Sequence, residues 1–137
     1  MITTSDMQAL FDRINEVCFE GKLPACELRV VKDNITKAPA FCESWDSRVH
    51  TRISFCEKYL KRISNSLEEV MLHEMLHYHL YLKYYAHLVG PGYHKAMGNS
   101  NRRDDLAGHT IEFFLTQEEL LTSVKKSDTM VLVLQAA

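Results

Sequence analysis

Two stretches of the chain repeat apolar residues at the spacing of an α-helix. Across residues 5–20 the apolar side chains share one stripe, and Gly21 then gives a typical helix end. The members of that stripe are Met7, Leu10, Phe11, Ile14, Val17 and Cys18. Residues 66–85 repeat apolar side chains at a similar spacing, and Ser66 followed by Glu69 fits a capping box. We therefore predict a helix over each stretch.

Between these helices the pattern changes to short runs that favour extended structure. Strands are predicted at residues 26–32, 38–45 and 50–55, because β-branched and aromatic residues are frequent there. Residues 45–48 are predicted to form the turn between the second and third strands. Residues 59–60 fit a short helical connection to the second long helix.

The C-terminal part of the chain has a less regular pattern. Residues 90–92 read Gly-Pro-Gly, a strong turn signal, and a short helix is predicted near residues 93–100. Residues 116–119 fit another capping box, which predicts a short helix near 117–124. The apolar run 130–134 predicts a final strand.

These elements predict an α+β fold with one small sheet. The sheet is expected to be antiparallel or mixed and to pack against the N-terminal helix and the helix of residues 66–85. A length of 137 residues, of which 46% are hydrophobic, is typical of a single domain with a substantial core. We predict one domain over residues 1–137, with a core of about 5–101 and a C-terminal extension at 102–137.

Composition and charge limit the partners and the cell compartment that we expect for the protein. The net charge of −2 gives no overall basic footprint for nucleic acid, and the local Lys and Arg groups fit a solvated surface. The four cysteines are widely spaced and form no C-x-x-C pair, so neither a structural zinc site nor a redox pair is indicated. The sequence shows no secretory signal pattern and no apolar run near the ~20 residues that cross a bilayer. We therefore expect a cytoplasmic protein with free thiols.

The motif H-E-x-x-H lies inside the second predicted helix, at residues 73–77. On a helix, residues four apart lie on one face, so His73 and His77 point the same way and can bind one Zn²⁺. Glu74 is then placed beside the metal and can act as general base on a water molecule. The motif alone can arise by chance, and the predicted helix around it strengthens the zinc interpretation.

A catalytic zinc site usually has three protein ligands, so a third is needed. His79 follows the second motif histidine by two residues, about 200° round the helix, and faces away. His87 would lie about 15 Å further along a continuing helix and cannot reach the same metal. His94 follows the Gly-Pro-Gly turn, where the chain can reverse, and is the preferred candidate. Asp105 and His109 are the alternatives.

Three segments carry a resemblance to a known family. Residues 10–24 are similar to an opening helix that leads into a Gly-x-Leu-Pro turn; they are followed by the motif at 73–77 and by Gly92-Tyr93-His94. Together they resemble the SprT-like metalloproteases over about residues 6–100. The third-ligand segment of that family usually reads His-Gly-x-x-Phe, whereas His94 is followed by Lys-Ala-Met, and the paired-cysteine zinc ribbon of many relatives is missing here.

The resemblance implies a minimal zincin-like domain that hydrolyses peptide bonds, with proteins on or near DNA as possible substrates. In this hypothesis His73, His77 and His94 bind Zn²⁺, and Glu74 takes the proton of the attacking water. The alternative is a non-catalytic zinc-binding adaptor or a self-inhibited domain, in which a fourth protein ligand fills the site. DNA as a partner is implied by the resemblance alone, and the net charge predicts weak, salt-sensitive or absent binding.

Overall fold

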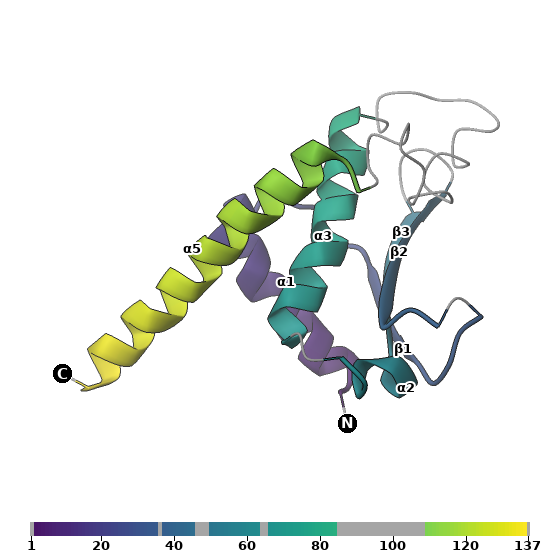
Figure 1. The fold of residues 1–137 in the computed structure, drawn as a ribbon, viewed down its shortest axis with the longest axis horizontal. Coiled ribbons are helices and arrows are strands. Elements are labelled where there is room, and N and C mark those ends of the chain that lie inside the picture. Colours follow the sequence, from purple (N-terminus) through teal and green to yellow (C-terminus); the bar gives the residue numbers. More distant parts are fainter. Residues whose placement is uncertain (1, 36, 46–49, 64–65, 85–108, 137) are drawn as a thin grey trace.

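The computed structural model describes residues 2–35, 37–45, 50–63, 66–84 and 109–136 (Figure 1). Within these ranges the elements follow the chain as α1 (Thr4–Phe19), β1 (Glu27–Val31), β2 (Ala40–Trp45), β3 (His50–Cys56), α2 (Glu57–Leu60), α3 (Leu67–Tyr84) and α5 (Ile111–Ala136). The helices and strands predicted between residues 5 and 85 are all present, with ends within a few residues of the predicted ones.

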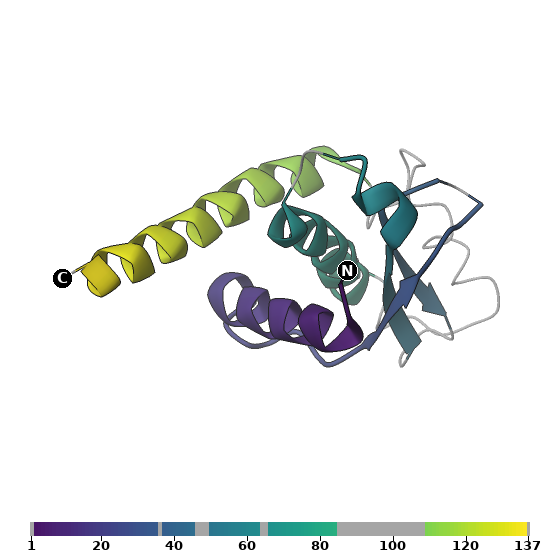
Figure 2. The ribbon, with the colours of Figure 1, turned by 90° about the horizontal axis from the view of Figure 1, so that it is seen from below.

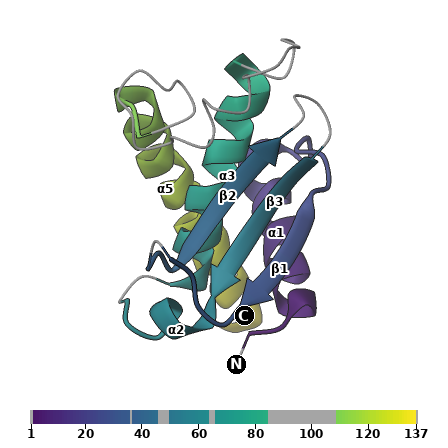
Figure 3. The same ribbon diagram turned by 90° about the vertical axis from the view of Figure 1, so that its right-hand side faces the viewer.

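The three strands form one mixed sheet in the order β1-β3-β2. β3 lies in the centre, parallel to β1 and antiparallel to β2. The helices α1, α3 and α5 all lie on one side of this sheet (Figure 3). The predicted α+β class with a small mixed sheet is therefore confirmed, including the packing of the sheet against α1 and α3.

The core lies between the sheet and the first two long helices. Ile53 and Phe55 point from the central strand toward the helices and are fully buried. They join Met7, Phe11 and Ile14 from α1 and several α3 side chains in one apolar cluster. A side chain of this size contributes roughly 1.5–3 kcal/mol when it is fully buried, so this cluster fixes α3 firmly on the sheet.

Local hydrogen bonds explain where α1 begins and ends and where α3 begins. Thr3 and Asp6 form a capping box at the start of α1, and Glu20 with a φ of 55° closes its end. Gly21 follows with a φ of 71°, a left-handed conformation that glycine adopts without strain. At the start of α3 the Glu69 N–H donates to Ser66 Oγ over 3.2 Å, as the predicted cap requires.

The prediction for the C-terminal part was wrong in two respects. Residues 117–124 belong to the longer helix α5, and the run 130–134 continues this helix and is not a strand. The capping residue is Thr110, whose Oγ1 accepts the Phe113 N–H over 3.2 Å, so Thr116 lies inside the helix. A short apolar run has no periodicity that separates strand from helix, and here the preceding helix simply continues through it.

The helix α5 packs against α1 and α3 on the side opposite the sheet. Its C-terminal end extends beyond the other elements in two perpendicular views (Figures 1 and 2). The predicted short helix near 93–100 lies outside the described residues. Among the described helices, none has the length and apolar character needed to cross a membrane.

Candidate metal centre

Three histidine side chains converge where α3 meets the start of α5. His73 and His77 come from consecutive turns of α3, and His109 stands two residues before α5. The Nε2 atom of His109 lies 3.0 Å from Nε2 of His73 and 3.2 Å from Nε2 of His77. One nitrogen of each ring therefore points to a common position.

The spacing of these nitrogens suits a zinc ion. With zinc–nitrogen bonds of about 2.0–2.1 Å in tetrahedral geometry, two ligand nitrogens lie roughly 3.3 Å apart. The two measured separations are close to that value, and the three ligand atoms all lie within 4.8 Å of one another. The three histidines can therefore hold one metal ion.

The protonation state of the rings is also suitable. Burial lowers the pKa of His73 below its ordinary value of 6.5; the hydrogen bond with Gln117 opposes this shift, and the neighbouring His109 adds to it. Partial burial of the ring lowers the pKa of His109 as well, although much of its side chain is exposed. Neutral imidazole is the form that binds metal ions, so these rings are ready to bind near neutral pH.

Phe113 packs against all three imidazole rings. Its side chain is fully buried, and its ring centroid lies 4.7 Å from that of His73, 4.5 Å from that of His77 and 5.2 Å from that of His109. Because Thr110 caps α5 at this point, the helix start sets the position of both His109 and Phe113. The apolar ring limits how far the three imidazoles can turn.

A polar contact orients His73 from the other side. Its Nδ1 atom lies 2.8 Å from Oε1 of Gln117, which follows His109 by about two helical turns along α5. A carbonyl oxygen only accepts hydrogen bonds, so Nδ1 carries the proton in this arrangement. The lone pair of His73 is then on Nε2, the atom that faces the other two histidines.

Glu74 is buried beside this cluster, with 6% of its surface exposed. Burial raises the pKa of its carboxyl group to about 8. Burial and, after it, the charge of Glu74 raise the pKa of the Cys42 thiol on β2. The Glu74 side chain therefore lies on the side of α3 that faces the sheet. Among the described residues no hydrogen bond to the Glu74 carboxyl group is formed. A buried carboxyl group without a partner is costly, which is typical of a group kept for chemistry.

A second polar cluster joins the end of α3 to the start of α5. The Glu112 carboxylate accepts a hydrogen bond from the Tyr84 hydroxyl and pairs with Lys83, whose Nζ lies 2.6 Å from Oε2. These contacts lower the pKa of Glu112 below its ordinary value. Glu112 is three residues from His109, so the cluster helps to hold the helix start that carries this histidine.

The structure brings together two of the preferred site residues and one of the alternatives. His73 and His77 meet as the motif predicts, and their partner is His109, one of the two alternatives to His94. His94 and Asp105 lie outside the described residues, so the assignment of His94 as a ligand stays a prediction.

The sequence does contain a signal that indicates His109 as the third ligand. The pattern His-Gly-x-x-Phe places phenylalanine four residues after the histidine; Phe113 has this spacing from His109, whereas the position four after His94 is Gly98. The preference for His94 relies on the Gly-Pro-Gly turn just before it, where the chain can reverse. Doubling the length of a connecting loop costs only about 0.6 kcal/mol of closure entropy, so a histidine further from that turn can reach the same helix face.

Comparison with known proteins adds one finding. Searches of curated proteins and of solved structures gave no significant match. The family model described as the SprT-like family matches residues 7–112, a span that includes most of α1, the three strands, α3 and all three clustered histidines. This match covers well over half of the chain, and the protein therefore belongs to the SprT-like family.

Proposed function

We propose that this protein is a zinc-dependent endopeptidase with His73, His77 and His109 as metal ligands. The observation that carries the proposal is the convergence of three imidazole nitrogens at the spacing of a tetrahedral zinc site. The SprT-like family is generally associated with metallopeptidase-like activity, which agrees with it. Three protein ligands leave a fourth position for water, as catalytic zinc sites do.

Glu74 is the proposed general base. A bound zinc ion would supply Lewis acidity and a water molecule with a pKa near 7. Glu74 follows the first ligand directly on α3, and its carboxyl group has no hydrogen-bond partner among the described residues to compete for its lone pairs. It would accept the proton of the attacking water and pass it to the leaving amine.

The test compares Glu74→Gln with the wild-type protein on an unfolded protein substrate such as casein. The amide has nearly the shape of the carboxyl group but is no base, so zinc content should be unchanged while hydrolysis falls by ~10²–10⁴-fold. Glu119→Gln changes an exposed carboxylate on α5 in the same way and serves as the control. Full activity of Glu74→Gln would remove this residue from the mechanism.

A non-catalytic zinc-binding adaptor, or a self-inhibited protease domain, is the second candidate. The observation that favours it is the position of His109 in the chain. This histidine lies just before helix α5, after the predicted core of residues 5–101. If His94 also binds the metal, four histidines would fill every position, as in structural zinc sites. A protein that holds zinc through four histidines and cleaves no substrate would support this candidate over the endopeptidase.

We also propose that DNA is at most a weak partner of this chain, although the family resemblance suggests DNA-associated substrates. Arg29 and Arg52 lie on the sheet but both pair with Glu43, and Lys58 pairs with Asp33. Paired cations offer little to a phosphate backbone. Fluorescence anisotropy with single-stranded and duplex DNA at physiological salt should show weak binding that falls steeply as salt is raised. Sub-micromolar affinity would contradict this.

A further inference from the structure

We propose that Gln117 is a positioning residue for the metal centre, which it serves by holding His73 in the tautomer that presents Nε2 to the ion. This inference rests on the proposed zinc site. Its basis is the 2.8 Å contact between His73 Nδ1 and Gln117 Oε1. The other nitrogen of the same ring lies 3.0 Å from His109 Nε2, so the two ends of the His73 ring face two different partners on or near α5.

The chemistry of imidazole makes this contact selective. A neutral ring has one N–H and one lone pair, and only the lone pair can bind a metal ion. If Nδ1 donates to the Gln117 carbonyl, the lone pair is on Nε2 and faces the cluster. If the Gln117 amide group turned round and donated to Nδ1, the proton would move to Nε2 and block metal binding. Outer contacts of this kind fix both the tautomer and the ring orientation of metal-bound histidines.

The position of Gln117 follows from the same helix face that supports the rings. Phe113 and Gln117 are four residues apart on α5, so they lie on one face of the helix. Phe113 is fully buried against the three imidazoles, and Gln117 is half-buried one turn later. The helix therefore carries one metal ligand just before its start, an apolar support in its first turn and a hydrogen-bond acceptor for His73 in the next.

Substitutions of Gln117 can separate the acceptor role from the packing role. Gln117→Met keeps the length of the side chain but has no strong acceptor, and zinc affinity should fall by about 10–100-fold. Gln117→Glu keeps an acceptor at the same place and should retain wild-type affinity or exceed it. Gln117→Lys can only donate and adds a positive charge, so it should bind zinc most weakly of the three.

Zinc affinity is measured by competition with a chromophoric chelator. Gln8→Met, an equivalent change at an exposed position of α1, is the control and should have no effect. The order of affinity Glu and wild type, then Met, then Lys supports the proposal. Equal affinity of the wild-type protein and Gln117→Met would overturn it, as would a loss in Gln117→Glu as large as that in Gln117→Met.

A second measurement uses the unmodified protein and does not depend on the folding of any variant. Long-range ¹H–¹⁵N NMR spectra of the metal-free protein at neutral pH distinguish the two tautomers of His73. The proposal requires the Nδ1–H form, and a predominant Nε2–H form would overturn it. If the wild-type protein bound no zinc, the proposed metal centre would fail and the role of Gln117 toward it would fail with it, whereas zinc binding with the Nε2–H tautomer would overturn only the role of Gln117.

Discussion

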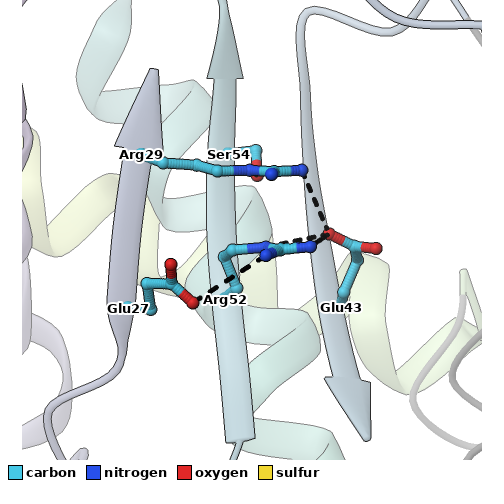
Figure 4. Close-up of polar contacts among 5 residues, drawn as sticks. All are labelled: Glu27, Arg29, Glu43, Arg52 and Ser54. Carbon is cyan, nitrogen blue, oxygen red and sulfur yellow. Dashed lines mark hydrogen bonds and ion pairs between the residues drawn. The ribbon is translucent and has the colours of Figure 1, made fainter. Parts of the chain in front are cut away.

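Two polar clusters in this protein differ in whether their members satisfy one another's charges and hydrogen bonds. One is the metal centre of His73, His77 and His109. The other, here called the sheet cluster, lies on the face of the sheet away from the helices (Figure 4). Its members come from all three strands: Glu27 and Arg29 from β1, Glu43 from β2, and Arg52 and Ser54 from β3.

In the sheet cluster each charge meets an opposite charge. Nη2 of Arg52 lies 3.0 Å from Oε1 of Glu43, and Nη1 of Arg52 lies 3.9 Å from Oε2 of Glu27. Nη2 of Arg29 lies 3.7 Å from Oε1 of Glu43. The Arg29 Nε–H also donates to Ser54 Oγ over 2.8 Å. Donors meet acceptors throughout, so these contacts satisfy the cluster, and it needs no ligand.

In the metal centre like groups converge. Three imidazole nitrogens point at one position, and at most one shared proton can lie between any two of them. A cation at that position would satisfy all three lone pairs together. Lone pairs that converge on one point therefore indicate a binding site for a cation, whereas opposite charges that alternate indicate a structural contact.

The largest expected effect tests the convergence itself. His109→Ala removes one of three ligands, so zinc affinity should fall by more than the ~10–100-fold that is typical of a residue outside the ligand shell. His94→Ala is made in parallel and should retain zinc if His109 is the third ligand. Bound zinc is measured by metal analysis after dialysis against a weak chelator.

The opposite pair of results would change the assignment of the third zinc ligand. Zinc loss in His94→Ala with retention in His109→Ala would restore His94 as the third ligand and leave His109 as a neighbour. Equal zinc loss in both variants would indicate four ligands and favour the adaptor over the endopeptidase.

The second expected effect concerns the cost of burying Glu74. Burial raises the pKa of its carboxyl group from 4.5 to about 8, so above pH 4.5 the folded protein binds a proton that the unfolded chain has released, and this costs free energy that an uncharged amide does not. Glu74→Gln should therefore raise the melting temperature of the metal-free protein at pH 8, in the presence of a chelator. A lower melting temperature would show that the carboxyl group stabilises the fold, which is not expected of a residue kept for catalysis.

The part of the fold that was predictable from the sequence is the part with local signals. The stripe of α1, the cap at Ser66 and the H-E-x-x-H spacing each depend on residues within one or two turns, and all appear as expected. The helix α5 was misjudged because its apolar run lacked a distinguishing period. The parallel pairing of β1 with β3 also depends on contacts between distant segments, which no local pattern reveals.

The same distinction applies to the metal centre. His73 and His77 are four residues apart on one helix, so the sequence was enough to bring them together. The approach of His109 depends on how α5 packs across α3, which is a tertiary contact. Phe113 and Gln117 were not identified from the sequence at all, because a core phenylalanine and a surface glutamine look ordinary until their contacts are known.

A smaller effect is expected at the cluster of Lys83, Tyr84 and Glu112. Hydrogen bonds from Lys83 and Tyr84 lower the pKa of Glu112, so its contribution to stability is present above the ordinary value of 4.5 and is lost as pH falls through the lower folded value. Glu112→Gln should destabilise the protein by about 1 kcal/mol at pH 7, since the cluster is partly exposed.

The pH dependence separates this explanation from a general loss of packing. The difference in melting temperature between wild type and Glu112→Gln should shrink as pH falls below 4.5. Glu118→Gln, an exposed neighbour on α5, should show little difference at any pH. A difference that stays constant with pH would mean that the charge of Glu112 does not matter for stability.

The smallest effect is expected in the sheet cluster, where the comparison with the metal centre is sharpest. Arg52→Met keeps the aliphatic part of the side chain and removes its charge, which should cost about 1 kcal/mol or less, because ion pairs that stay partly open to water contribute little. A double-mutant cycle with Glu43→Gln should give a coupling energy in the same range, since Arg29 remains beside position 43. Zinc affinity should not change in either variant. A loss of zinc in Arg52→Met would show that the two clusters are linked through the sheet, and the satisfied cluster could then no longer be regarded as purely structural.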